Sequence, residues 1–288
     1  MMTEFSVSTV AQRLAVKRSS INWGKGLLIG TGILFSVLLL VIPIAWIFLT
    51  AFSKGIDRVA QNLSDPDMLH AIWLTVLIAF ITVPLNLVFG VMTAWLVTRF
   101  QFPGRQLLLT LIDIPFAISP VVAGLLYLLF YGANGGLGSW LGNYDIQLMF
   151  SWPGMVLVTV FVTCPFVVRE LVPVMLSQGN QEDEAAILLG ASGWKMFWHV
   201  TLPNIRWALL YGVVLTNARA IGEFGAVSVV SGAIRGETYT LPLQVELLYQ
   251  DYNTVGAFTA AALLAVMAII TLIVKSALQW RLSRQQGG

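Results

Sequence analysis

Residues 180–203 read NQEDEAAILLGASGWKMFWHVTLP, a polar, helix-forming segment that lies between two long apolar runs. Its three acids come first, where a carboxylate interacts favourably with the positive end of a helix dipole. Asn180 is a good N-cap, and its side chain is expected to accept a hydrogen bond from the backbone N–H of Asp183. Gly190 and Gly193 then give the chain a place to break or turn. The order of residues therefore predicts a helix, a break and a second helix outside the apolar runs.

The second half of this segment places large apolar side chains outside the apolar runs. Exposed apolar surface of this kind usually marks a docking site. The side chains are those of Trp194, Met196, Phe197 and Trp198. An amphipathic helix on the lipid interface would also explain the aromatic residues, but it does not explain the order of acids, glycine and Leu-Pro. Pro203 is expected to end the second helix just before the next apolar run.

The chain as a whole is strongly apolar. Of its 288 residues, 57% are hydrophobic and 10% are charged, and the mean hydropathy is +0.81. Soluble domains have about 25% charged residues, so the composition indicates an integral membrane protein surrounded by lipid. The net charge of +2 is too small and too scattered for nucleic-acid binding. The single cysteine, Cys164, excludes an internal disulfide, and no Cys/His/Asp cluster has metal-ligand spacing, so we expect no metal site.

Six apolar runs are long enough to cross the hydrocarbon core, which takes about 20 residues as a helix. They are too long and continuous for the alternating strands of a barrel, so we predict an all-α membrane protein with six transmembrane helices. Prolines within several runs suggest kinked or locally opened helices. One domain, residues 27–280, lies between an N-terminal segment of residues 1–26 and a tail of residues 281–288. The predicted spans lie near 27–51, 70–98, 107–131, 154–176, 208–231 and 256–279.

The basic residues predict the orientation of these helices. Six spans place both termini on one side of the membrane, and the loops and termini of that side hold twelve Lys and Arg. The loops of the other side hold only Lys54, Arg58 and Arg235. Because the side rich in basic residues faces the cytoplasm, we expect both termini and the segment 180–203 to be cytoplasmic.

Two charges fall inside the fifth predicted span. Arg219 and Glu223 are four residues apart, so we expect them to share one helix face and to pair. Charges at this depth are costly unless they pair or face water. One hypothesis is a structural ion pair that locks helices or subunits together. The other is a helix that lines the translocation path, in which Arg219, with Asn217 and Ser228 nearby, lowers the barrier for an anion; the pair as a whole is neutral and would not by itself select anions.

Three further charges lie near the cytoplasmic ends of predicted spans. Asp113 precedes two prolines in the third span and is interpreted as a boundary acid that reaches water, rather than as a gating residue. Arg169 and Glu170 lie at the inner end of the fourth span and are interpreted as interfacial residues.

The segment 180–203 resembles the EAA loop of the membrane subunits of bacterial ABC importers. That loop reads E-A-A, three residues, G, nine residues, I, one residue and L-P. Val200 stands here in place of the isoleucine, which is a conservative departure. The other positions of the pattern are Glu184, Ala185, Ala186, Gly190, Leu202 and Pro203.

The resemblance extends to the whole chain. The stretches IPFAISPVVAG (114–124) and ARAIGEFGAV (218–227) are similar to the permease subunits of sulfate and molybdate importers. TRFQFPGRQLLLTL (98–111) and CPFVVRELVPVMLSQG (164–179) resemble the CysW-type family of sulfate/thiosulfate permeases in particular. The resemblance implies the type I ABC importer permease (MetI-like) fold and a multi-pass protein of the bacterial inner membrane.

The resemblance also implies the partners and the function. The chain would be a permease subunit for sulfate or thiosulfate and not an enzyme, because ATP and Mg²⁺ would be used by a separate ABC ATPase dimer (CysA type). This chain itself would bind no cofactor. A second permease subunit (CysT/CysU type) and a periplasmic sulfate/thiosulfate-binding protein would complete the importer. Glu184, Ala185, Ala186 and Gly190 would contact the ATPase, and Trp194, Leu202 and Pro203 belong to the same coupling loop.

Other functions fit the sequence less well. The chain has no Walker A sequence, so it cannot supply phosphate chemistry itself. A secondary transporter often has paired broken helices and inverted repeats, and the sequence contains no repeat. A membrane-embedded enzyme would need a catalytic constellation, and none is found. A permease for molybdate or tungstate stays an alternative, as do a homodimeric and a heterodimeric channel.

Overall fold

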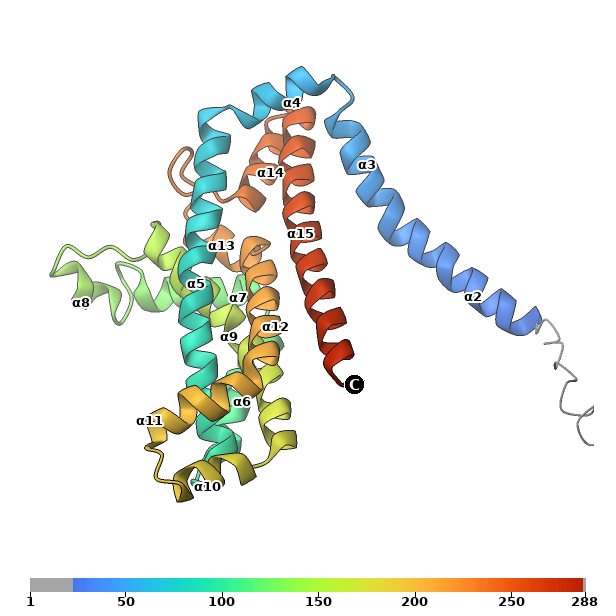
Figure 1. Cartoon of the computed structure of the whole chain (residues 1–288). Helices are drawn as coiled ribbons and strands as arrows, with labels where there is room; N and C mark the ends of the chain where they lie inside the picture. Colours follow the sequence, from blue (N-terminus) through green and yellow to red (C-terminus); the bar gives the residue numbers. More distant parts are fainter. Residues whose placement is uncertain (1–22, 287–288) are drawn as a thin grey trace, which may run out of the picture. The chain divides into compact units, whose positions relative to one another are not determined.

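The computed structural model describes residues 23–286, with side chains at residues 23–277 and 280. Every regular element in this part of the chain is a helix, which confirms the predicted all-α class (Figure 1). The predicted N-terminal segment, residues 1–26, falls mostly outside the described residues. The side chains of the predicted tail, residues 281–288, fall outside them as well. The orientation that was predicted partly from the basic residues of these two segments therefore stays a prediction.

The chain divides into two units, one ending at Trp46 and one beginning at Ile47. The described part of the first unit is helical throughout. It consists of α2 (Trp23–Ser36), the π-helical segment η1 (Val37–Val41) and the start of α3 (Ile42–Ala51). Residues 24–51 contain a stretch of mean hydropathy 2.7 and are long enough to cross a membrane, as predicted for the first span.

Three long helices of the second unit correspond to the second, fourth and sixth predicted spans. They are α5 (Pro66–Arg99), α9 (Trp152–Gln178) and α15 (Thr254–Gln286), and each contains a stretch of mean hydropathy 2.0 or more. The start of α5 follows the usual sequence rules for a helix N-terminus. Asp65 is the N-cap, its side chain accepts from two backbone N–H groups of the first turn, and a proline takes the first helical position.

The third predicted span, 107–131, is broken into α6 (Arg105–Ala117) and α7 (Pro120–Tyr131), which are bent by 109°. A proline disfavours the helical conformation of the residue before it. Ser119 accordingly has an extended ψ of 136°, and Pro120 opens the new helix. The local opening predicted from the prolines is confirmed, and the two halves together count as at most one span.

The fifth predicted span, 208–231, is not one helix, and this corrects the prediction. Helix α12 (Leu202–Ile221) ends at Gly222, and a short connector leads into α13 (Gly225–Val230). Within the described residues, four helices are long and apolar enough to cross a membrane, or five if α6 and α7 form one span. The chain is therefore a multi-pass membrane protein.

Two buried clusters form the main core of the second unit, one among α5, α7, α9 and α13 and one where α5, α9 and α12 pack side by side (Figure 1). Small residues let these backbones approach closely. A Cβ at Gly90 would lie 2.5 Å from the Cβ of Val167, so only glycine fits at this position of α5. Nearby, the buried amide of Asn86 donates to the hydroxyl of Thr163 at 2.6 Å and joins α5 to α9.

Short helices occupy both ends of α5. Helix α14 forms within residues 232–255 and lies, with α4, at the end where α5 begins (Figure 1). The segment 180–203 lies at the end where α5 finishes. The short elements are α4 (Ile56–Leu63), α8 (Gly138–Gly142), α10 (Gln181–Leu188), α11 (Gly193–Met196), the π-helical η2 (Phe197–Thr201) and α14 (Leu241–Gln250).

Helices α7 and α13 meet at a glycine contact, which gives a first testable prediction. A Cβ at Gly124 of α7 would lie 2.7 Å from the carbonyl oxygen of Ala226 in α13. Gly124→Ala should therefore force the helices apart and destabilise the protein by about 1–3 kcal/mol, measured as a shift of SDS-induced unfolding in detergent. Gly142→Ala is the matched control, because no atom lies within 4 Å of its added Cβ. Equal unfolding of both variants would contradict the close crossing.

Candidate functional site

The segment 180–203 forms a helical hairpin. Helix α10 ends at Leu188, and Gly190 has a φ of +87°, a left-handed conformation that glycine adopts without strain. The predicted break at Gly190 is confirmed. Gly193, in contrast, is the first residue of α11, and the side chain of Ser192 caps that helix by accepting from the backbone N–H of Lys195.

The second arm of the hairpin continues without a break into α12. The elements α11, η2 and α12 follow one another directly, so the prediction that Pro203 ends a helix is wrong. Pro203 lies in the first turn of α12. Because proline has no N–H to bond to the carbonyl four residues earlier, the wider π turn of residues 197–201 accommodates it. Movement of the hairpin is thereby linked to α12 through continuous helix.

A buried cluster holds the hairpin against the end of α5. The guanidinium Nε of Arg99 lies 2.6 Å from Oδ2 of Asp183, and the two side chains are 11% and 8% exposed. The other carboxylate oxygen, Oδ1, accepts from the hydroxyl of Thr201 at 3.0 Å. Asn180 does not cap α10 as predicted, because its Oδ1 accepts instead from Nη1 of Arg99 at 2.7 Å. We call these four residues the inner clamp.

Further contacts join the hairpin to α9 and α12. Arg99 Nη1 also donates to the carbonyl of Met175 near the end of α9, at 3.3 Å. The amide of Asn204 donates to Glu182, and Gln178 donates to the carbonyl of Asn204 at 3.1 Å. The inner clamp and these bonds therefore connect the hairpin to three long helices, α5, α9 and α12.

The outer side of the hairpin is exposed and apolar. Leu188 and Leu189 are 87% and 89% exposed, and Trp194 across the break is 70% exposed. Trp194 stacks on Phe197, which also contacts Trp198. We call this surface the hairpin tip, and it consists of Ile187, Leu188, Leu189, Trp194 and Trp198, all of them exposed.

The predicted coupling residues divide between this surface and the core. Glu184, Ala185, Gly190 and Pro203 are exposed, whereas Ala186 is half-buried. Among the described residues, the side chain of Glu184 has no hydrogen-bond or ion-pair partner, so its charge is free to meet another protein. Leu202 is half-buried and packs against the apolar cluster formed by α5, α9 and α12.

Arg219 and Glu223 form the predicted ion pair, with Nη1 2.7 Å from Oε2. They do not share a helix face, because α12 ends before Glu223, and this corrects the prediction. Glu223 is 1% exposed, and its second oxygen accepts from the backbone N–H of Ala226 at 2.9 Å. The carboxylate therefore ties the end of α12 to the start of α13. Arg219 is 33% exposed.

The other two predicted path residues do not join this pair. The hydroxyl of Ser228 donates to the carbonyl of Gly225 within α13, at 2.9 Å. Asn217 is half-buried, and its side chain makes no hydrogen bond to another described residue.

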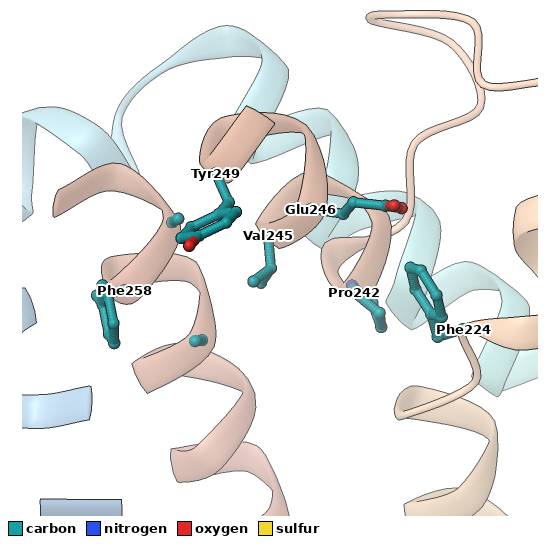
Figure 2. A pocket seen from close by; sticks show the side chains of 8 residues that line it. Phe224, Pro242, Val245, Glu246, Tyr249 and Phe258 are labelled. Atoms are coloured by element: carbon teal, nitrogen blue, oxygen red, sulfur yellow. The ribbon is translucent and has the colours of Figure 1, made fainter. Parts of the chain in front are cut away.

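A groove of about 330 Å³ lies between α14, α15 and the connector that follows α12. Figure 2 shows Phe224 and Phe258 at its two ends, with Val245 and Tyr249 of α14 between them. Its lining is apolar apart from Glu246, so it offers no site for an anion. Within residues 23–277, no group of three or more His, Cys, Asp or Glu could hold a metal ion.

Comparison with known proteins identifies the family. The sequence model for the binding-protein-dependent transport system inner membrane component matches residues 86–284. The sulfate transport system permease protein CysW of Escherichia coli (strain K12) is 78% identical over 266 residues, which cover 92% of this chain and 91% of that protein. The sulfate transport system permease protein CysT of the same organism is 34% identical over 95% of this chain and 99% of its own length.

A solved structure shares the fold. It is the bacterial alginate ABC transporter in complex with an alginate pentasaccharide-bound periplasmic protein, whose matching chain has a TM-score of 0.75 at 18% identity. The match covers 90% of this chain and 95% of that chain. Family model, relatives and fold agree over most of the sequence, and this chain therefore belongs to the binding-protein-dependent transport system inner membrane component family.

Proposed function

We propose that this chain is the membrane-spanning permease subunit of an ABC importer that translocates sulfate and thiosulfate. The observation that carries the proposal is the 78% identity, over 92% of the chain, to a sulfate transport system permease. The fold shared with an ABC transporter supports the same class of protein. The chain is not an enzyme, and its role is to form part of the channel while a separate subunit hydrolyses ATP.

The proposed topology has six crossings with both termini in the cytoplasm of a bacterial cell. In addition to the four long spans, α6 with α7 and α12 with α13 would each form one broken crossing. The distribution of basic residues supports this orientation, with eleven on the inner side, Arg169 of α9 not counted, and three on the outer side. Residues 27–280 then constitute one permease domain, with the hairpin on the cytoplasmic side.

The proposed importer contains a second permease of CysT type, a periplasmic binding protein and a dimer of ABC ATPases. The relative CysT is similar to 95% of the length of this chain, which supports a paralogous partner with the same fold. The alginate transporter was solved with a periplasmic protein bound, and this supports delivery of the anion from outside. ATP and Mg²⁺ act in the ATPase, and this chain binds no cofactor.

The hairpin is proposed as the coupler. An apolar surface with one unpaired carboxylate suits docking in a cleft of the ATPase. The inner clamp holds the hairpin to α5, whose Arg99 also bonds to α9, and continuous helix holds the hairpin to α12. Closure of the ATPase dimer would therefore move these helices as rigid bodies and open the path to the outside.

Charge reversal at Glu184 tests the coupler. Glu184→Lys, or Gly190→Pro, should reduce ATP-driven sulfate uptake at least about tenfold while the complex still inserts and assembles. Gly190→Pro acts through the backbone, because proline cannot adopt the φ of +87° found there. Gln181→Lys adds a positive charge to the same helix but keeps Glu184, and it should retain uptake. Normal ATP-driven uptake in Glu184→Lys and Gly190→Pro would remove the hairpin from the coupling mechanism.

The function itself is tested in proteoliposomes that contain the complete importer. We expect uptake of radiolabelled sulfate and thiosulfate that requires ATP, the ATPase and the binding protein. Unlabelled molybdate and tungstate, added as competitors, decide between the two classes of oxyanion importer. Uptake driven by an ion gradient without ATP would contradict the proposal.

A further inference from the structure

A second ion pair lies in the membrane-spanning part, between α6 and α9. Nε of Arg169 lies 2.9 Å from Oδ1 of Asp113, and the two side chains are 55% and 47% exposed. The sequence suggests independent boundary and interfacial roles for these residues, but the structure joins them. Arg169 lies more than two helical turns before Gln178, so its Cα is about 14 Å from the end of α9.

Such a pair is unusual in a membrane span. Charged side chains within the hydrocarbon layer face water, a bundle interior or another polar group, because contact with lipid is costly. The side chain of Arg169 is 55% exposed, and its contacts are with Asp113 and Phe116 of α6. The exposed side of the pair is therefore expected to meet an aqueous path rather than lipid.

The guanidinium is held in one orientation by two contacts. Asp113 accepts from its Nε, and the ring of Phe116 lies beneath it, with 4.3 Å between Cζ and the ring centroid. Phe116 is itself held by an edge contact with Phe166, at 5.1 Å between centroids. The two Nη groups of Arg169 have no acceptor among the described residues. These N–H groups form a planar fork that matches two oxygens of a tetrahedral oxyanion.

We propose that Arg169 is an anion-binding residue of the translocation path, and that Asp113 and Phe116 hold its two Nη groups toward the oxygens of the transported oxyanion. This inference rests on the proposed function as an oxyanion importer. The carboxylate of Asp113 also makes the pair neutral, so the anion binds weakly enough to leave again, which conduction requires.

The other membrane arginine is arranged differently. Nη1 of Arg219 pairs with Glu223, a carboxylate that is fully buried and caps α13. One of its two Nη groups is already engaged, and its partner Glu223 ties α12 to α13. The pair of Arg169 and Asp113, in contrast, bridges two helices through Nε alone and leaves its outer edge open.

The first test uses the complete importer in proteoliposomes. Arg169→Gln should lower sulfate uptake about tenfold or more, because a charge-assisted double hydrogen bond is lost, while ATP hydrolysis stimulated by the loaded binding protein stays within about twofold. Arg169→Lys keeps the positive charge but lacks the planar fork, so its sulfate uptake should lie between that of the wild type and that of Arg169→Gln. Arg206→Lys is the control, because Arg206 also lies over an aromatic ring, at 5.3 Å from Trp207, and should transport normally.

A second measurement does not depend on transport. Cys164 is the only cysteine of this chain, so Cys164→Ser combined with Arg169→Cys gives this subunit a single thiol, and its labelling in the assembled complex is scored on the separated subunit. A thiol reagent that does not enter lipid should modify this thiol, because the proposal places position 169 on an aqueous path.

If the thiol at position 169 does not react, the partner subunit covers the pair. If Arg169→Gln takes up sulfate within twofold of the wild type, Arg169 does not bind the anion. Either result overturns the inference. Failure of the unmodified importer to take up sulfate would instead overturn the proposed function.

Discussion

Asp183→Ala is expected to release the hairpin from the membrane helices and to uncouple ATP hydrolysis from transport. Removing one partner of a buried ion pair costs about 3–5 kcal/mol, because the other charge stays buried without compensation. Here the uncompensated group is Arg99, which is 11% exposed. Thr201 loses its acceptor at the same time. Hydrogen exchange over residues 180–203 should accelerate, and the ATP hydrolysed per sulfate transported should rise severalfold.

The control for this prediction is Glu182→Ala. Glu182 lies on the same turn of α10 but is exposed and bonded only to Asn204, so its loss should cost less than about 1 kcal/mol. A double-mutant cycle of Arg99→Ala and Asp183→Ala isolates the energy of the pair itself. If hydrogen exchange over residues 180–203 were no faster in Asp183→Ala than in Glu182→Ala, the inner clamp would not hold the hairpin.

The local features of the hairpin could be predicted because they depend on nearby residues only. A glycine between two helix-forming segments predicts a break wherever the segments come to lie, and Gly190 has the left-handed φ that favours it. The inner clamp could not be predicted in this way. Arg99 and Asp183 lie far apart in the sequence, and the acid-first pattern of α10 is fully explained by the helix dipole. Only the packing of α5 against the hairpin brings them together.

The errors at Pro203 and Glu223 have a common cause. A proline in the interior of a helix often ends it, but the π turn of residues 197–201 lets the helix continue past Pro203, and the sequence does not reveal where such a turn forms. Spacing by four residues indicates a shared face only if the helix is continuous. At Gly222 the helix ends, so Glu223 reaches back to Arg219 from a connector. In both cases the position of a helix end decided the outcome, and helix ends are the least predictable feature of a sequence.

Glu223→Ala is expected to have the second large effect, because this carboxylate serves two helices at once. The variant loses the ion pair to Arg219 and the cap on the backbone N–H of Ala226. We expect destabilisation of about 2–3 kcal/mol, somewhat less than for Asp183→Ala, because Arg219 is one-third exposed and keeps partial hydration. SDS-induced unfolding in detergent measures the change. Glu223→Gln retains an acceptor for Ala226 and should lose only part of this stability.

The same position separates the two hypotheses for Arg219. If the pair is purely structural, replacing both residues by glutamine removes the two charges together, and the double variant should be more stable than Glu223→Gln alone and should transport sulfate. If Arg219 binds the anion in the translocation path, the double variant should regain stability but should not regain sulfate uptake. Glu223 caps α13 from a fully buried position, so we expect the double variant to recover both stability and sulfate uptake. A stable double variant with uptake still reduced tenfold would place Arg219 beside Arg169 as a contact for the anion.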